Sequence, residues 1–186
     1  MVKTASTMTP LGSVAPDFIL QDVISEQALQ LSSYVSGFKG FVIMFICNHC
    51  PYVKHINQAL VALTTKYKDS GIGFIAINAN DPATYADDSP NHMKLTAQAE
   101  GYDFPYLFDD TQDVARAMNA ACTPDFFVYN DQKELIYRGQ FDDSRPGNAI
   151  TPSGADLAHA LECLLHHQVN QQNQKPSLGC NIKWKE

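Results

Sequence analysis

Two cysteines separated by two residues stand where a strand pattern changes into a helix pattern. Cys47 ends an apolar run, and Cys50 directly precedes Pro51, a residue favoured in the first turn of a helix. The unpaired N–H groups and the positive dipole end of a helix start stabilise a thiolate. A thiolate attacks disulfides, and a second thiol within reach can release the mixed disulfide. We interpret Cys50 as the attacking thiol and Cys47 as the resolving thiol; the reverse assignment is the competing interpretation.

Neighbouring residues could tune or share this chemistry. Cations at His49 and Lys54, beside the expected thiolate, would lower its pKa further. Cys122 and Cys180 are two further candidates for the resolving thiol, and Cys180 lies in a polar tail that could fold back over the site. Two other interpretations of the pair stay open. The cysteines could pack as small hydrophobic residues, or zinc could be bound by a set of four residues: Cys47, His49, Cys50 and His55.

The surrounding pattern predicts the elements that position the pair. A continuous apolar run over 41–47 indicates a buried strand, and apolar residues at spacings of three and four predict a helix over 51–68. A second buried strand is predicted over 72–78, which completes a βαβ unit with parallel pairing. Further elements are helices over 91–100, 113–121 and 153–167, and an antiparallel hairpin of strands over 125–129 and 134–138.

This order of elements is that of a thioredoxin fold, a central mixed β-sheet with helices on both faces. We expect a single α/β domain over 1–186, with an N-terminal arm at 1–14 and an extended C-terminal tail at 168–186. In thioredoxin folds a cis proline lies beside the active cysteine. Pro124 follows Thr123 directly before a predicted strand, so we expect a cis peptide bond there and count both residues in the site.

The composition and charge of the chain limit the classes of partner and the location that we expect. The net charge is −7, and we find no basic run or basic–aromatic stripe, which argues against a nucleic-acid partner. The apolar runs are much shorter than the roughly 20 residues of a membrane span. Five cysteines in 186 residues, with no apolar targeting segment at the N-terminus, favour a reducing cytoplasm with mostly free thiols. We expect no cofactor.

The chain also resembles a known family through specific strings. The similarity is to the thioredoxin-like proteins of the alkyl hydroperoxide reductase/thiol-specific antioxidant (peroxiredoxin-like) superfamily, and it implies a thioredoxin fold with a redox-active cysteine. The strings that carry it span nearly the whole chain: Ala15-Pro-Asp-Phe18, Phe45-Ile-Cys-Asn-His-Cys-Pro-Tyr-Val-Lys-His55, Ala76-Ile-Asn-Ala-Asn-Asp81, Asp87-Asp-Ser-Pro90, Tyr137-Arg-Gly-Gln-Phe-Asp-Asp-Ser-Arg-Pro-Gly-Asn148 and Gln174-Lys-Pro-Ser-Leu-Gly-Cys-Asn-Ile-Lys-Trp-Lys185.

Two departures from the related patterns bear on activity. The peroxiredoxin motif P-x-x-x-T-x-x-C fails at both cysteines, because counting back from Cys50 gives Ile43 and Cys47 where that motif has proline and threonine. Val53 stands where a standard thioredoxin has its resolving cysteine. The leading hypothesis is therefore a thiol–disulfide oxidoreductase that takes a disulfide or thiol substrate and a dithiol reductant. The alternatives are a thiol peroxidase that reduces hydroperoxides and a non-enzymatic binding or metal-carrying module.

Overall fold

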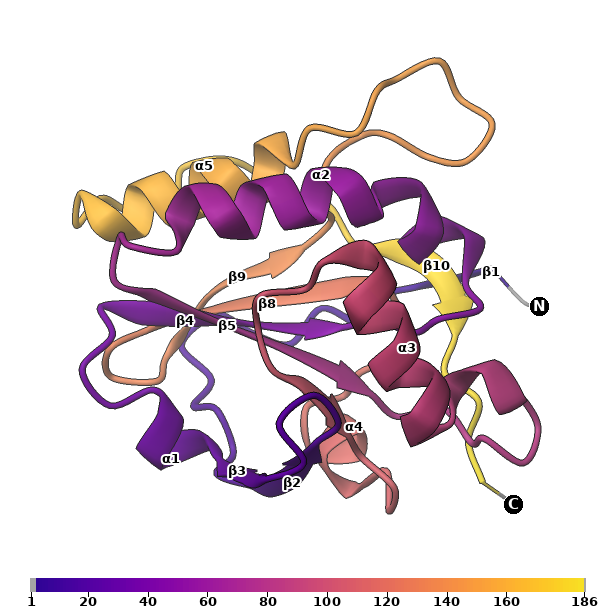
Figure 1. The fold of residues 1–186 in the computed structure, drawn as a ribbon. Helices are drawn as coiled ribbons and strands as arrows, with labels where there is room; N and C mark the ends of the chain where they lie inside the picture. Colours follow the sequence, from indigo (N-terminus) through magenta and orange to yellow (C-terminus); the bar gives the residue numbers. More distant parts are fainter. Residues whose placement is uncertain (1–2, 186) are drawn as a thin grey trace.

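A seven-stranded mixed sheet forms the centre of the protein in the computed structural model, which describes residues 3–185 (Figure 1). The βαβ unit is confirmed, because β4 and β5 pair in parallel, whereas β8 pairs antiparallel to β4 and to β9. The strands follow one another across the sheet in this order: β3 (Ala28–Gln30), β2 (Ile19–Asp22), β6 (Tyr106–Phe108), β5 (Ile72–Asn78), β4 (Gly40–Phe45), β8 (Asp125–Asn130) and β9 (Leu135–Gly139).

Helices cover both faces of this sheet (Figure 1). Because side chains alternate along a strand, Val42 and Met44 of β4 pack on one face and Ile43 and Phe45 on the other. The first face lies under α2 (Pro51–Tyr67), α3 (Pro90–Glu100) and α5 (Ala155–Leu165). The second face lies under α1 (Leu31–Tyr34) and α4 (Asp113–Ala117). The thioredoxin-like layering predicted from the sequence is thus present.

The helix predicted over 113–121 is shorter in the structure. It ends at Ala117, and Asn119 adopts a positive φ of 51°, a backbone conformation that cannot continue a right-handed helix. A short 3₁₀ turn, η1 (Ala86–Asp88), lies in the polar segment between β5 and α3. None of the described helices has the length and apolar character needed to cross a membrane.

The two ends of the chain meet in a second, three-stranded sheet. Its order is β1 (Lys3–Ala5), β10 (Leu178–Asn181) and β7 (Cys122–Thr123), with antiparallel pairing throughout. The predicted C-terminal tail is therefore extended, but part of it is the central strand of a sheet. The N-terminal arm holds that strand from its other side (Figure 1).

Candidate active site

Cys50 is the N-cap residue of α2, as its position before Pro51 predicted. Its backbone is extended, with φ −70° and ψ 122°, and its carbonyl oxygen accepts hydrogen bonds from the N–H groups of Val53 at 3.1 Å and Lys54 at 3.0 Å. The side chain is fully buried. A cysteine at a helix start is therefore present, but it is covered.

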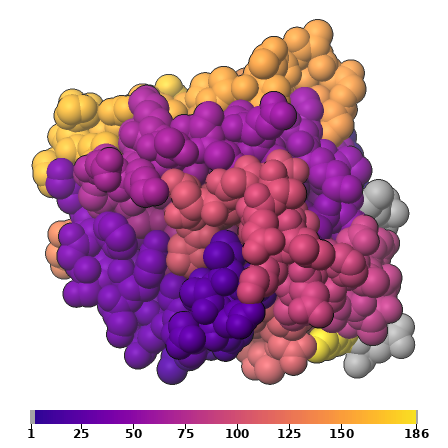
Figure 2. Space-filling model, viewed as in Figure 1, coloured from indigo at the N-terminus to yellow at the C-terminus, as the bar shows by residue number. Residues whose placement is uncertain are grey.

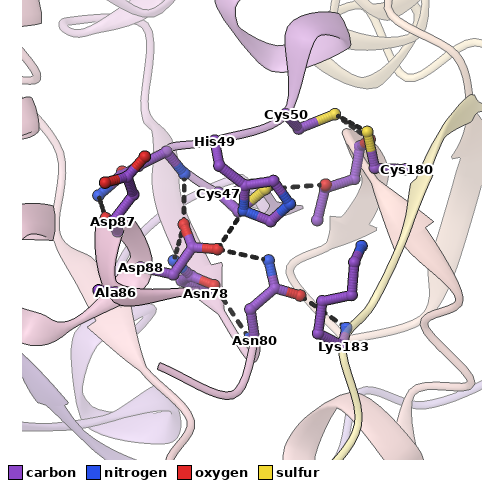
Figure 3. A network of polar contacts seen from close by, with 12 residues as sticks. Cys47, His49, Cys50, Asn78, Asn80, Ala86, Asp87, Asp88, Cys180 and Lys183 are labelled. Atoms are coloured by element: carbon purple, nitrogen blue, oxygen red, sulfur yellow. Dashed lines mark hydrogen bonds and ion pairs between the residues drawn. The ribbon is translucent and has the colours of Figure 1, made fainter. Parts of the chain in front are cut away.

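The sulfur of Cys50 is directed at the sulfur of Cys180, and Cys47 lies nearby (Figure 3). The distance from Sγ of Cys50 to Sγ of Cys180 is 2.8 Å, longer than the about 2.05 Å of a disulfide bond. Cys47 precedes Cys50 in the C-x-x-C motif and lowers the pKa of Cys50. The Cys50 sulfur also lies 3.2 Å from the carbonyl oxygen of Thr123, and the Thr123 hydroxyl lies 3.2 Å from Sγ of Cys47. Three sulfur atoms and Thr123 thus form one buried cluster.

The three thiols differ in acidity. The pKa of Cys50 is lowered to about 5, chiefly by the hydrogen bond from Cys47. Donors from Cys180 and from the backbone N–H of Val53 act in the same direction, and burial opposes them. Burial and the neighbouring Cys50 sulfur raise the pKa of Cys47. Burial raises the pKa of Cys180 to about 12. At neutral pH the site therefore holds one thiolate between two protonated thiols.

The predicted cations contribute little to this acidity. His49 directs Nδ1 at the carboxylate of Asp88, and its ring stacks on Tyr85 with centroids 4.1 Å apart. Lys54 is exposed on α2. The largest contributions to the lowered pKa of Cys50 come from thiol and backbone donors rather than from His49 or Lys54. Cys47, rather than His49 or Lys54, therefore makes the largest contribution to the lowered pKa of Cys50.

Asp88 is the residue that sequence reasoning missed. This fully buried carboxylate accepts hydrogen bonds from His49, from the N–H of Asn48 at 2.7 Å, and from the amides of Asn78 at 3.2 Å and Asn80 at 2.9 Å (Figure 3). Burial by itself would raise the pKa of Asp88, but these hydrogen bonds outweigh it and the pKa is lowered. The only sequence signal was the string 87–90, which we used for the resemblance and not for the site.

The C-terminal strand delivers Cys180 to the site. Cys180 is paired with Thr123 in the register of β10 and β7. Gly179 makes this approach possible, because a Cβ at that position would lie 1.9 Å from the carbonyl oxygen of Thr123. The strand continues into a segment whose Ile182 N–H bonds to the carbonyl oxygen of Ala121 at 3.1 Å. The predicted cis peptide bond between Thr123 and Pro124 is confirmed.

Of the other predicted residues, Cys122 has its sulfur hydrogen-bond contacts with backbone carbonyl oxygens rather than with Cys50. Its buried sulfur lies 3.9 Å from the carbonyl oxygen of Pro124 and 4.0 Å from that of Ser177, and burial raises its pKa. It is a fully buried side chain of β7.

The four residues considered as zinc ligands do not gather at one point. Within residues 3–185, donor atoms of Cys47, His49 and Asp88 lie within 4.8 Å of one another, and His55 is not part of this group. His49 and Asp88 already bond to each other, so this group is first of all a hydrogen-bonded cluster.

The cluster is closed to the surface. Cys47, Cys50 and Cys180 are each at most 2% exposed. In the space-filling view, α2, α3 and the segment that precedes α3 cover this side, and the C-terminal segment emerges only as a small yellow patch (Figure 2). A substrate therefore reaches Cys50 only when part of this cover moves.

Known proteins resemble this chain over most of its length. A solved structure of a conserved protein from Geobacillus kaustophilus is 49% identical, with a TM-score of 0.97, and the match covers 100% of this chain and 97% of that one. A curated relative from the same organism, the thiol-disulfide oxidoreductase ResA, is 26% identical over 71% of this chain and 70% of its own length.

The fold has more distant neighbours as well. The thioredoxin domain of a thiol-disulfide oxidoreductase from Bacteroides vulgatus superposes with a TM-score of 0.65 at 17% identity, over 88% of this chain and all of that one. The structural matches agree with the predicted fold, and the name of the curated relative agrees with the predicted class of enzyme, an oxidoreductase. The model of the AhpC/TSA family matches residues 11–138, well over half of the sequence. The chain belongs to the AhpC/TSA family.

Proposed function

We propose that this protein catalyses thiol–disulfide exchange, with Cys50 as the nucleophile. The observation that carries the proposal is the buried cluster at the start of α2, where the sulfur of Cys50, with its lowered pKa, lies 2.8 Å from a second sulfur. A thiolate of this kind attacks disulfides, and a neighbouring thiol can then displace the product. The name of the curated relative from Geobacillus kaustophilus supports the same reaction class.

Two thiols are placed to complete the reaction. Cys47 belongs to the C-x-x-C motif and hydrogen-bonds to Cys50, whereas Cys180 comes from β10. Attack by either one on a mixed disulfide at Cys50 gives an internal disulfide and a released product thiol. Cys47 is the resolving thiol in our proposal, because it stays beside Cys50 even when the C-terminal strand moves.

The chemistry needs no cofactor, since the electrons come from the thiols themselves. The substrate is a disulfide or an oxidised thiol, and an external dithiol returns the enzyme to its reduced form. A reducing, cytoplasmic location remains a prediction from the cysteine content of the sequence.

The test is the reduction of a chromogenic aromatic disulfide by the prereduced protein. We expect Cys50→Ser to abolish the release of coloured thiol, and Cys47→Ala and Cys180→Ala to show which thiol releases the second equivalent. Cys163→Ser is the matched control, because Cys163 lies in α5, outside the sulfur cluster. Full activity in Cys50→Ser would refute the proposal. Rapid peroxide consumption combined with no reaction with disulfides would replace it with the thiol peroxidase alternative.

A further inference from the structure

His49 and Asp88 have no part in the exchange reaction as described so far, yet they are buried next to it. The His49 side chain is 7% exposed and that of Asp88 is fully buried. A donor atom of each lies within 4.8 Å of the other and of Sγ of Cys47, and Figure 3 shows the imidazole ring beside Cys47. Cysteine, histidine and aspartate in this arrangement match the general pattern of a thiol, a base and a group that orients the base.

The hydrogen bonds define which ring nitrogen is available. Nδ1 of His49 is directed at the ionised carboxylate of Asp88, so Nδ1 carries a proton. Nε2 is buried and has no hydrogen-bond partner among residues 3–185. A buried imidazole nitrogen without a partner is uncommon, because it costs the solvation that the atom had in water. In the neutral ring it is a base that is ready to accept a proton.

The exchange reaction creates a need for such a base. Before reaction, Cys47 donates its thiol proton toward the Cys50 thiolate. Once Cys50 is part of a mixed disulfide, that acceptor has lost its negative charge. Cys47 must then lose a proton to attack, although burial opposes its ionisation.

We propose that His49 is the general base and acid of the resolving step and that Asp88 positions its ring; this rests on the proposed function. The Cys50 thiolate first attacks a disulfide RS–SR′, forms a bond to RS and expels R′S⁻, which takes a proton from solvent. Nε2 of His49 then accepts the proton of Cys47, whose sulfur attacks Sγ of Cys50. The Cys47–Cys50 disulfide forms, RS⁻ leaves and takes the proton back from Nε2. The two cysteines are oxidised by two electrons, and the substrate is reduced to two thiols.

The surroundings hold the ring in place for this role. Tyr85 stacks on one face of the imidazole, and the Lys183 ammonium lies 5.2 Å from the Tyr85 ring centroid. The titratable groups that face His49 include Asp88, Cys47 and Tyr85, with Lys183 against the Tyr85 ring and Asp87 next to Asp88. Asn78 and Asn80 fix the Asp88 carboxylate from the end of β5 and the residues that follow it. Apart from His49, Asp88 is thus held by groups that do not titrate.

The experiment separates the two steps in a Cys180→Ala background, where only Cys47 can resolve. Rapid mixing with an aromatic disulfide that releases a coloured thiol gives one equivalent when Cys50 attacks and a second when Cys47 resolves. We expect His49→Gln to slow the second release about 100-fold, the lower end of general acid–base effects, and to leave the first within about threefold. His55→Gln is the matched control, since His55 lies on α2 outside this group.

Two further readouts exclude a merely structural effect. In His49→Gln the second release should rise steeply with pH, because the Cys47 thiol, whose pKa is raised, must then ionise without a base beside it; in the parent this rise should be shallower. Asp88→Asn, which keeps the shape but not the charge, should slow the second release less than His49→Gln does and shift its pH profile. An unchanged second release in His49→Gln, an equal loss in both releases, or an equal loss in His55→Gln would overturn the proposal. Absence of the first release in the parent would refute the proposed function itself.

Discussion

The contact between Gly179 and Thr123 allows a quantitative test of how β10 controls access to Cys50. In Gly179→Ala the new Cβ would lie 1.9 Å from the Thr123 carbonyl oxygen and 2.6 Å from its carbon. Both are backbone atoms and cannot rotate away. An ordinary carbon–oxygen contact is about 3.4 Å, so β10 must move by about 1.5 Å. Such a shift lengthens the 3.1 Å hydrogen bond between Ile182 and Ala121 beyond a useful distance and separates Cys180 from Cys50.

The strand thereby loses the hydrogen bond between Ile182 and Ala121 and the one between Cys180 and Cys50. Loss of these two hydrogen bonds weakens the docking of β10 by about 2 kcal/mol. If Cys50 reacts only from the open state, its alkylation rate follows the population of that state and rises about 30-fold. The assay is alkylation by iodoacetamide at pH 8, with modification at Cys50 measured by mass spectrometry.

Two variants control this prediction. Cys180→Ala removes the thiol and leaves the strand able to dock, so it should change the rate only a few-fold. Gly101→Ala is the matched glycine substitution outside β10, at the residue that follows α3 (Pro90–Glu100). Its φ of 75° strains an alanine there, but the new Cβ would meet no atom within 4 Å, so the variant adds no contact of the kind made at Gly179. An alkylation rate in Gly179→Ala equal to that of the parent would refute the idea that β10 closes the site.

Three further results are expected. First, Cys50 should make stability depend on pH: its folded pKa, about 5, is below the ordinary 9.0, so its contribution is complete above pH 9 and is lost as the pH falls toward 5. The difference in unfolding free energy between the reduced parent and Cys50→Ser, measured in urea, should shrink by about 1.4 kcal/mol per pH unit over that range. Second, Arg138→Met should cost about 3–5 kcal/mol in the same assay, because it leaves the fully buried Asp125, 3.1 Å from Arg138, without its partner, whereas Lys175→Met at an exposed pair should cost less than about 1 kcal/mol. Third, Cys47→Ser should keep a hydrogen-bond donor to Cys50, whereas Cys47→Ala should not. The pH profile of Cys50 alkylation should therefore move to higher pH in the alanine variant, by at least about 1 unit more than in the serine variant. Equal profiles would show that Cys47 does not lower the pKa of Cys50.

The parts of the fold that depend on local pattern could be predicted from the sequence. The apolar run before Cys47 and the helical spacing after Pro51 are each sufficient to define a strand and a helix, and the structure has β4 and α2 there. For the strand and the helix the information lies within a few consecutive residues. The cis peptide bond at Pro124 was expected because a strand begins immediately after it and because the fold predicted around the C-x-x-C motif has a cis proline at that point.

The parts that depend on distant contacts could not be predicted. The segment around Cys180 alternates apolar and other residues over 178–185, but this local pattern does not say which strands it pairs with, and its place is fixed by pairing with residues 3–5 and 122–123. Asp88 lies in a polar loop whose sequence is typical of an exposed turn. It is buried because three amide groups and an imidazole, from the ends of two strands, converge on it. The local pattern of a single sequence does not show that residues distant along the chain converge in this way.

The cluster links acidity to redox reactivity more directly than a helix start does. Hydroxyl or amide donors would stabilise the Cys50 thiolate but could not react with it. Here two of the principal donors are thiols, from Cys47 and Cys180, so the groups that create the nucleophile are also the groups that can trap it as a disulfide. Oxidation removes one of these donors together with the negative charge that it stabilised. The reduced state therefore gains the stabilisation of a buried thiolate that the oxidised state lacks, and by linkage such a site favours its own reduced form.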